Sequence, residues 1–152
     1  MMRKECAMNG EAVHILLVED DPAHAEIVCR NLQKSNVGNK IAHVSDGEAA
    51  LDYLYRRGNY DECDAPTPHL VLLDLRLPKV DGLEVLRTVK SDPILKSIPV
   101  VILTTSAAES DMAKAYSHHA NSYLVKPVGL HDFMNLMSTL GYYWLAWNRY
   151  PY

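Results

Sequence analysis

The chain has 152 residues, of which 48% are hydrophobic and 22% are charged, with a formal net charge of −4. This length fits a single domain with a core of its own. The acidic balance argues against nucleic acid as a partner. No apolar run approaches the length that spans a membrane, so we expect no membrane partner either.

The cysteines, Cys6, Cys29 and Cys63, are odd in number and widely spaced. They include no Cys-x-x-Cys pair, which favours reduced thiols over disulfides or a thiolate metal site. We therefore expect a cytoplasmic protein. Residues 1–12 show no periodicity and predict a loose N-terminal tail.

Short apolar runs alternate with helical patterns along the rest of the chain. The runs predict five strands, over residues 13–18, 40–44, 70–73, 100–103 and 122–125. Helical spacing predicts five helices, over residues 22–35, from 47 onward, over 83–90, over 109–118 and from about 130. This alternation is typical of an α/β fold with a doubly wound parallel sheet and helices on both faces.

Polar side chains follow four of these strands at the point where each strand ends. Asp74 follows residues 70–73, and Glu19 and Asp20 follow the first strand. Thr104 and Lys126 end the last two strands. Ligands of open α/β sheets bind beyond the carboxyl ends of the strands, so we expect these five residues to line one rim.

This set of side chains suits phosphoryl transfer. Three carboxylates in one pocket repel one another, and hard oxygen ligands favour Mg²⁺. Lys126 adds a positive charge and Thr104 a hydroxyl, while Asp74 can attack phosphorus as a nucleophile. Asp21 is interpreted differently, as the N-cap of the helix that begins at Pro22.

The motifs resemble those of response-regulator receiver domains in two-component signalling. The matching stretches are Ile-Leu-Leu-Val-Glu-Asp-Asp-Pro at 15–22, Leu-Asp-Leu-Arg-Leu-Pro-Lys-Val-Asp-Gly at 73–82, Pro-Val-Val-Ile-Leu-Thr-Thr at 99–105 and Tyr-Leu-Val-Lys-Pro at 123–127. The resemblance covers residues 13–140 and leaves 141–152 as an aromatic extension of the last helix. It implies a five-stranded sheet in the flavodoxin-like order 2-1-3-4-5.

The resemblance also implies a role for each site residue. Asp74 would accept a phosphoryl group from a sensor histidine kinase, and the protein would signal through a phosphorylation-dependent protein surface rather than turn over an external substrate. The other implied roles are Mg²⁺ ligands for Asp20, for Glu19 through water and for the backbone carbonyl of Arg76, phosphate neutralisation for Lys126, and switching for Thr104 and Tyr123. The peptide bond before Pro127 would be cis.

Two features depart from an ordinary receiver. Arg76 lies two residues past Asp74, where it either covers the phosphate and slows water attack or forms a surface salt bridge. Residues 58–68 form a long loop, which is interpreted as a tolerated insertion in preference to a binding loop. Together with the aromatic C-terminus, this loop resembles the single-domain regulators that partner bacterial phytochromes, which implies a phytochrome-type kinase as partner.

An apolar stripe continues past the expected end of the core. Its members recur at helical spacing: Phe133, Leu136, Met137, Leu140, Tyr143, Trp144 and Trp147. Exposed aromatics beyond a core indicate a protein interface, so we expect a homodimer built on the last helix, with Tyr143, Trp144 and Trp147 in the interface. The alternative is that this extension folds back over its own domain.

Other functions remain open at this point. A flavodoxin-like FMN binder would need a phosphate loop after the first strand, where Glu19, Asp20 and Asp21 repel phosphate. A haloacid-dehalogenase-type phosphatase would need a second Asp at the place of Arg76. A non-phosphorylated docking module is also possible, although the complete set of acids, Thr104 and Lys126 argues against it.

Overall fold

The structure is a computed structural model, and it describes residues 12–34, 38–61 and 66–150. Most of the predicted N-terminal tail, together with Cys6 and Cys63, lies outside these residues. The elements are β1 Val13–Val18, α1 Pro22–Gln33, β2 Asn39–Val44, α2 Gly47–Tyr55, β3 Leu70–Leu73, α3 Gly82–Ser91, β4 Val100–Thr104, α4 Glu109–Ser117, β5 Ser122–Val125 and α5 Leu130–Gly141. Short 3-10 turns cover Gly58–Tyr60 and Leu95–Ser97, and a π-helical segment covers Tyr142–Trp147.

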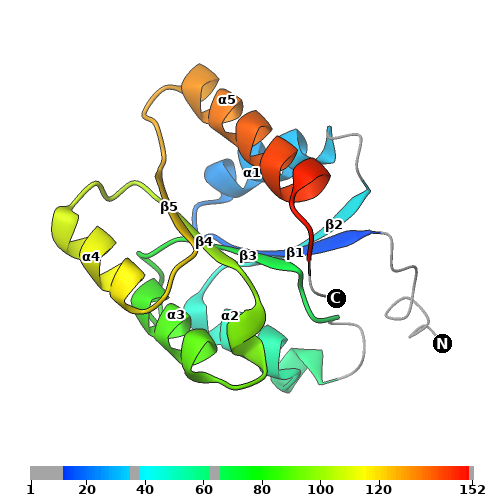
Figure 1. The fold of residues 1–152 in the computed structure, drawn as a ribbon, viewed down its shortest axis with the longest axis vertical. Helices are drawn as coiled ribbons and strands as arrows, with labels where there is room; N and C mark the ends of the chain where they lie inside the picture. The colour runs from blue at the N-terminus through cyan, green and yellow to red at the C-terminus, as the bar shows by residue number, and fades with distance from the viewer. Residues whose placement is uncertain (1–11, 35–37, 62–65, 151–152) are drawn as a thin grey trace.

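The five strands form one parallel sheet in the order β2-β1-β3-β4-β5 (Figure 1). The predicted fold class and strand order are therefore confirmed. The strands that the sequence predicted as continuous apolar runs, β3 and β4, are buried at every position. Both lie inside the sheet with helices over either face, which is why no polar residue alternates along them.

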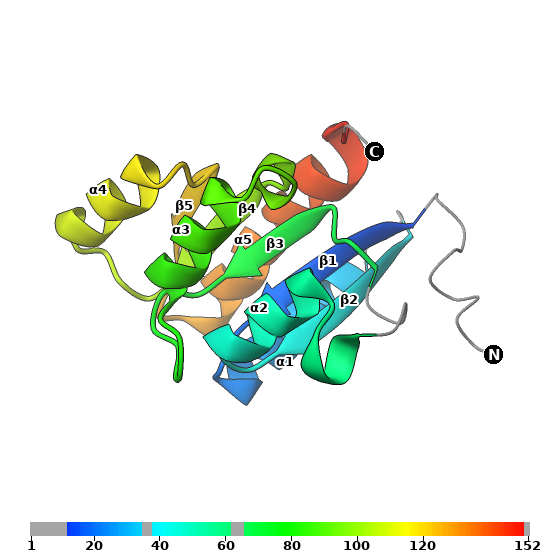
Figure 2. The same cartoon turned by 90° about the horizontal axis from the view of Figure 1, so that it is seen from below.

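The helices form a layer on each face of the sheet. Helices α1 and α5 cover one face, and α2, α3 and α4 cover the other (Figures 1 and 2). Each layer buries its own cluster of apolar side chains. Met137 of α5 and Val28 of α1 pack against one face, while Leu86 of α3 and Ala115 of α4 pack against the other.

Aspartates are the N-caps of three of the helices. The side chain of Asp21 accepts hydrogen bonds from the amides of Ala23 and His24, so Asp21 is the N-cap of α1, as predicted. Asp46 and Asp81 cap α2 and α3 in the same way. A side-chain cap satisfies amides that have no partner inside the helix, which is why these three helices begin directly after an aspartate.

The C-terminal extension packs on its own domain. Leu145 is buried and Trp144 packs against the cluster that α1 and α5 form with the sheet. Further along, the phenol of Tyr150 donates to the backbone oxygen of Trp144 at 2.5 Å. The ring centres of Tyr150 and His69 lie 5.4 Å apart. The extension thus folds back over the domain at these positions.

Candidate functional site

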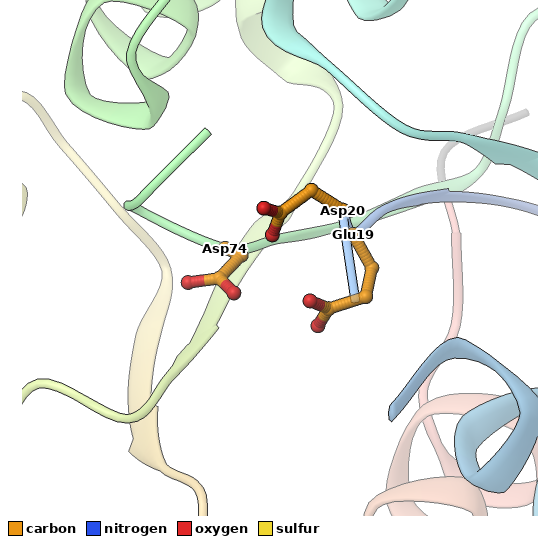
Figure 3. A group of neighbouring side chains, drawn as sticks. All are labelled: Glu19, Asp20 and Asp74. Atoms are coloured by element: carbon orange, nitrogen blue, oxygen red, sulfur yellow. The ribbon is translucent and has the colours of Figure 1, made fainter. Parts of the chain in front are cut away.

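Three carboxylates gather at the carboxyl ends of β1 and β3. Carboxylate oxygens of Glu19, Asp20 and Asp74 all lie within 4.8 Å of one another (Figure 3). Glu19 and Asp74 are buried, whereas Asp20 is exposed to solvent. The sequence therefore identified residues that the fold brings into one group.

Strand register places these residues side by side. Val18 pairs with Leu73 at the ends of β1 and β3. The Asp74 amide continues this ladder by donating to the Val18 oxygen at 3.1 Å, and the Glu19 amide donates to the Val44 oxygen at 3.0 Å. The backbones next to both acids are thus held by the sheet, which makes the group rigid.

Lys126 reaches the same group from the end of β5. Its ammonium donates to Glu19 Oε1 at 2.5 Å and to Asp74 Oδ2 at 3.0 Å, and its side chain is 1% exposed. The Lys126 amide donates to the Thr104 oxygen at 2.7 Å, so sheet pairing directs the side chain inward. The predicted cis bond before Pro127 is wrong: no cis peptide bond occurs among the residues that the structure describes, and Lys126 reaches Glu19 and Asp74 with a trans bond after it.

Charge at the site is unbalanced towards the negative. A single ammonium faces the buried carboxylates of Glu19 and Asp74, and Asp20 lies beside them. Burial raises the pKa of Glu19 to about 7, with Lys126 opposing the rise and the Asp74 carboxylate adding to it. A proton or a cation at this place relieves the excess negative charge.

The donor set fits a hard divalent cation. All three side chains offer oxygen, and one of them is open to solvent, where bound water can complete the coordination. No softer ligand belongs to this group among the residues that the structure describes. Arg76 follows Asp74 closely, and its amide lies 3.4 Å from Asp74 Oδ1.

Thr104 and Tyr123 lie on the neighbouring strands β4 and β5. Thr104 is fully buried, and its hydroxyl oxygen accepts from the Ser106 amide at 3.4 Å. The half-buried phenol of Tyr123 donates to the Ser106 backbone oxygen at 2.9 Å. Ser106 therefore connects the two residues that the resemblance implies as switch residues.

Arg76 forms a salt bridge, which was one of its two expected roles. Its guanidinium donates to Asp111 Oδ2 at 2.6 Å, although Arg76 itself is 64% exposed. Asp111 is buried at the start of α4 and also accepts from the Ser106 hydroxyl at 2.6 Å. Asp111 was not predicted as a site residue, since nothing in the local pattern of α4 indicates a partner 35 residues away.

His24 is a second residue at the site that was not predicted from the sequence. Its Nδ1 lies 3.0 Å from the ammonium of Lys126, on the side of α1 that faces the site. Its ring also meets the edge of Phe133 of α5, with ring centres 5.5 Å apart. The local pattern gave no signal for this contact, because Lys126 lies 102 positions further along the chain.

The residues predicted for a dimer interface differ in exposure. Tyr143 is 55% exposed, whereas Trp144 packs partly into its own domain. The side chain of Trp147 lies outside what the structure describes.

None of the helices within residues 12–34, 38–61 and 66–150 has both the length and the apolar character needed to cross a membrane.

Comparison with known proteins points to one family. The family described as response regulator receiver domain matches residues 15–138. The chain is 47% identical to the probable methanogenesis regulatory protein FilR2 of Methanothrix harundinacea, over 90% of this chain and 86% of that protein. It is 43% identical to the response regulator Rcp1 of Synechocystis, over 86% of this chain and 88% of that protein.

Solved structures agree with this result. The Mn²⁺-bound form of Rcp1 superposes with a TM-score of 0.89 at 41% identity, covering 92% of this chain and 99% of that one. The phosphorylated cyanobacterial phytochrome response regulator RcpA superposes with a TM-score of 0.88 at 40% identity, covering 93% and 99%. The resemblance inferred from the sequence motifs is therefore confirmed.

Proposed function

This chain belongs to the response regulator receiver domain family, and we propose that Asp74 accepts a phosphoryl group from the phosphohistidine of a sensor histidine kinase. One observation carries the proposal: a buried aspartate meets an ammonium at 3.0 Å beside two further carboxylates. The phosphorylated state of RcpA, a protein of the same fold at 40% identity, supports it.

The chemistry follows from the residues around Asp74. A carboxylate oxygen of Asp74 forms the new bond to phosphorus, the bond from phosphorus to the donor imidazole nitrogen breaks, and that nitrogen keeps the electron pair. Lys126 neutralises charge on the transferred oxygens. Glu19, Asp20, Asp74 and the backbone carbonyl of Arg76 would hold Mg²⁺, which supplies further positive charge when bound.

The biological role is that of a phosphoacceptor in a signalling pathway. The chain would act in the cytoplasm and would catalyse only its own phosphorylation and a slow loss of the phosphoryl group. A phytochrome-type kinase is the donor that we propose, because RcpA is a cyanobacterial phytochrome response regulator and Rcp1 has nearly the same fold. We take residues 13–140 as the receiver unit and 141–152 as its extension.

The output would come from a change at Thr104 and Tyr123. A phosphoryl group adds up to about two negative charges at Asp74. Thr104 would move towards the phosphoryl oxygens and Tyr123 would turn inward, which removes the hydrogen bond that Tyr123 gives to Ser106. This change would alter the surface formed by α4, β5 and α5.

The same surface is proposed to join two copies of the chain. Its exposed apolar side chains are Tyr116, Val125, Val128 and Leu130, and Tyr143 is exposed on the extension. A dimer that uses them covers apolar area next to the switch residues, so phosphorylation could tune its stability. Light scattering on the full chain at high micromolar concentration, with and without phosphorylation, tests the dimer.

The decisive experiment measures phosphate incorporation at Asp74. Wild type should gain one phosphoryl group from acetyl phosphate in a Mg²⁺-dependent reaction, read by intact-protein mass spectrometry. Asp74→Asn keeps the shape of the side chain but has no nucleophilic carboxylate oxygen, so it should incorporate none. Asp132→Asn, an exposed aspartate in the first turn of α5, is the matched control and should behave as wild type.

Two results would contradict the proposal. One is incorporation into Asp74→Asn at the wild-type rate, which would place the acceptor elsewhere. The other is equal incorporation into wild type in excess chelator, which would remove the metal from the reaction.

A further inference from the structure

The ammonium of Lys126 has a complete set of acceptors. A lysine ammonium carries three N–H donors and no acceptor. The structure provides three partners, Glu19 Oε1 at 2.5 Å, Asp74 Oδ2 at 3.0 Å and His24 Nδ1 at 3.0 Å. His24 is therefore part of the hydrogen bonding of the buried lysine rather than a neighbour of the site.

The imidazole of His24 is held on several sides. Phe133 of α5 meets it in an edge arrangement, with an interplanar angle of 66°. Its Nε2 faces Asp21 Oδ2 at 3.7 Å, and its side chain is 29% exposed. These contacts come from the N-cap of α1 and from α5, so the ring has little freedom to leave Lys126.

The chemistry of the pair specifies the tautomer of His24. Because an ammonium can only donate, the contact at 3.0 Å requires a lone pair on Nδ1. The proton of the neutral ring then lies on Nε2, on the side of the Asp21 carboxylate. A proton on Nδ1 would instead point at the ammonium.

The three partners of Lys126 differ in what happens to them during phosphorylation. Asp74 loses its negative charge when it forms the acyl phosphate, and Glu19 belongs to the carboxylate group that would face the cation. His24 is the one partner of the three that takes no part in either change. It can keep one N–H of Lys126 in place while the other two are redirected to the incoming phosphoryl oxygens.

We propose that His24 is a positioning residue for phosphoryl transfer, which holds Lys126 through Nδ1 in the orientation that neutralises the phosphoryl oxygens. This inference rests on the proposed function, since it concerns how Lys126 acts on the group that Asp74 receives. The proposed function needs Lys126, and the sequence motifs that identified the site do not include His24.

The test compares two substitutions that differ in whether they keep an acceptor. His24→Leu removes it, and the phosphorylation rate at saturating acetyl phosphate should fall about tenfold. His24→Asn places an amide oxygen near the position of Nδ1 and should recover most of the rate. The acetyl phosphate concentration for half-maximal rate should stay unchanged in both, because His24 positions Lys126 in the reaction rather than binding the donor. His131→Leu, at an exposed histidine of α5, is the matched control and should equal wild type.

A second readout does not depend on activity. Long-range ¹H–¹⁵N spectra of the full chain without phosphate should show His24 protonated on Nε2 and unprotonated on Nδ1. Two results would overturn the proposal: His24→Leu phosphorylating at the wild-type rate, or a proton on Nδ1 in the wild-type protein. Asp74→Asn separates this failure from that of the proposed function, since wild type would still be labelled and Asp74→Asn would not.

Discussion

At Glu19, burial and the charge of Lys126 act on the pKa in opposite directions. Glu19 is 1% exposed, and both the ammonium of Lys126 and the carboxylate of Asp74 act on its charge. The lysine lowers its pKa, but burial and the second carboxylate outweigh this and raise the pKa to about 7. Without a bound cation, Glu19 therefore takes up a proton at a pH at which an exposed glutamate has lost it.

This shift predicts how stability depends on pH. Between about pH 4.5 and 7 the folded state keeps a proton that the unfolded state has released, so the free energy of unfolding falls as the pH rises through this range. Glu19→Gln keeps the shape and an acceptor for Lys126 but cannot ionise. In chelator it should lose this part of the pH dependence and be more stable than wild type at about pH 8.

Urea unfolding at several pH values measures this prediction. Glu26→Gln, at an exposed glutamate of α1 that pairs with Arg30, is the control and should follow wild type across the range. Parallel pH curves for wild type and Glu19→Gln would show that Glu19 does not titrate in this range.

At the scale of elements, the start of α3 packs closely against the backbone of Asp74 at the end of β3. A Cβ at Gly82 would lie 2.2 Å from the backbone oxygen of Asp74 and 2.6 Å from the Cα of Leu75. Gly82→Ala should therefore displace the backbone that carries the phosphoacceptor. We expect a loss of about 2 kcal/mol in the free energy of unfolding and slower phosphorylation.

Gly38→Ala is the control for this change. A Cβ at Gly38 meets nothing within 4 Å, so the variant should keep the stability and phosphorylation rate of wild type. Thermal unfolding and mass spectrometry measure both properties. If Gly82→Ala were as stable and as active as wild type, the close approach of Gly82 to the Asp74 backbone would not constrain this turn.

Helix α4 is tied to the site by the salt bridge between Arg76 and Asp111. Asp111 accepts hydrogen bonds from both the guanidinium and the Ser106 hydroxyl. Asp111→Asn should therefore lower the free energy of unfolding by about 1–3 kcal/mol. Arg76 would then be free to cover the phosphoryl group of Asp74. The acyl phosphate of this variant should persist longer after the donor is removed, because the arginine hinders attack by water.

The lifetime is measured by mass spectrometry after rapid removal of acetyl phosphate. Glu109→Gln removes one exposed charge from the same turn of α4 and should leave the lifetime unchanged. A lifetime for Asp111→Asn equal to that of wild type would show that the salt bridge does not restrain Arg76.

At the scale of the whole molecule, the C-terminal extension contributes one side chain to the core and exposes another to solvent. Leu145 is 5% exposed within the core under α1 and α5, whereas Tyr143 is 55% exposed. Leu145→Ala should lower the free energy of unfolding by about 2–5 kcal/mol because it leaves a cavity. Tyr143→Ala should change it by less than about 0.5 kcal/mol, as expected for a surface position.

Denaturant unfolding and light scattering distinguish these roles. Tyr143→Ala should shift the full chain towards monomer at a concentration at which wild type is dimeric. A monomeric wild type at high micromolar concentration, with and without phosphate, would refute the dimer, and an unchanged stability of Leu145→Ala would refute the packing of the extension.

The sequence by itself determined the features that depend on neighbouring residues and on the rules of parallel sheets. Apolar runs predicted the strands, including β3 and β4, because burial on both faces leaves a continuous pattern. The grouping of Glu19, Asp20, Asp74 and Lys126 followed in the same way, since parallel strands bring their carboxyl ends to one rim.

Only the tertiary structure decided which distant side chains meet. Arg76 pairs with Asp111 across 35 positions, and His24 meets Lys126 across 102. It also separated Trp144, which packs on its own domain, from the exposed Tyr143 beside it. The local pattern carries no signal for such contacts, because they depend on how helices and loops are placed relative to one another. The periodicity of a helix indicates only which of its faces is buried.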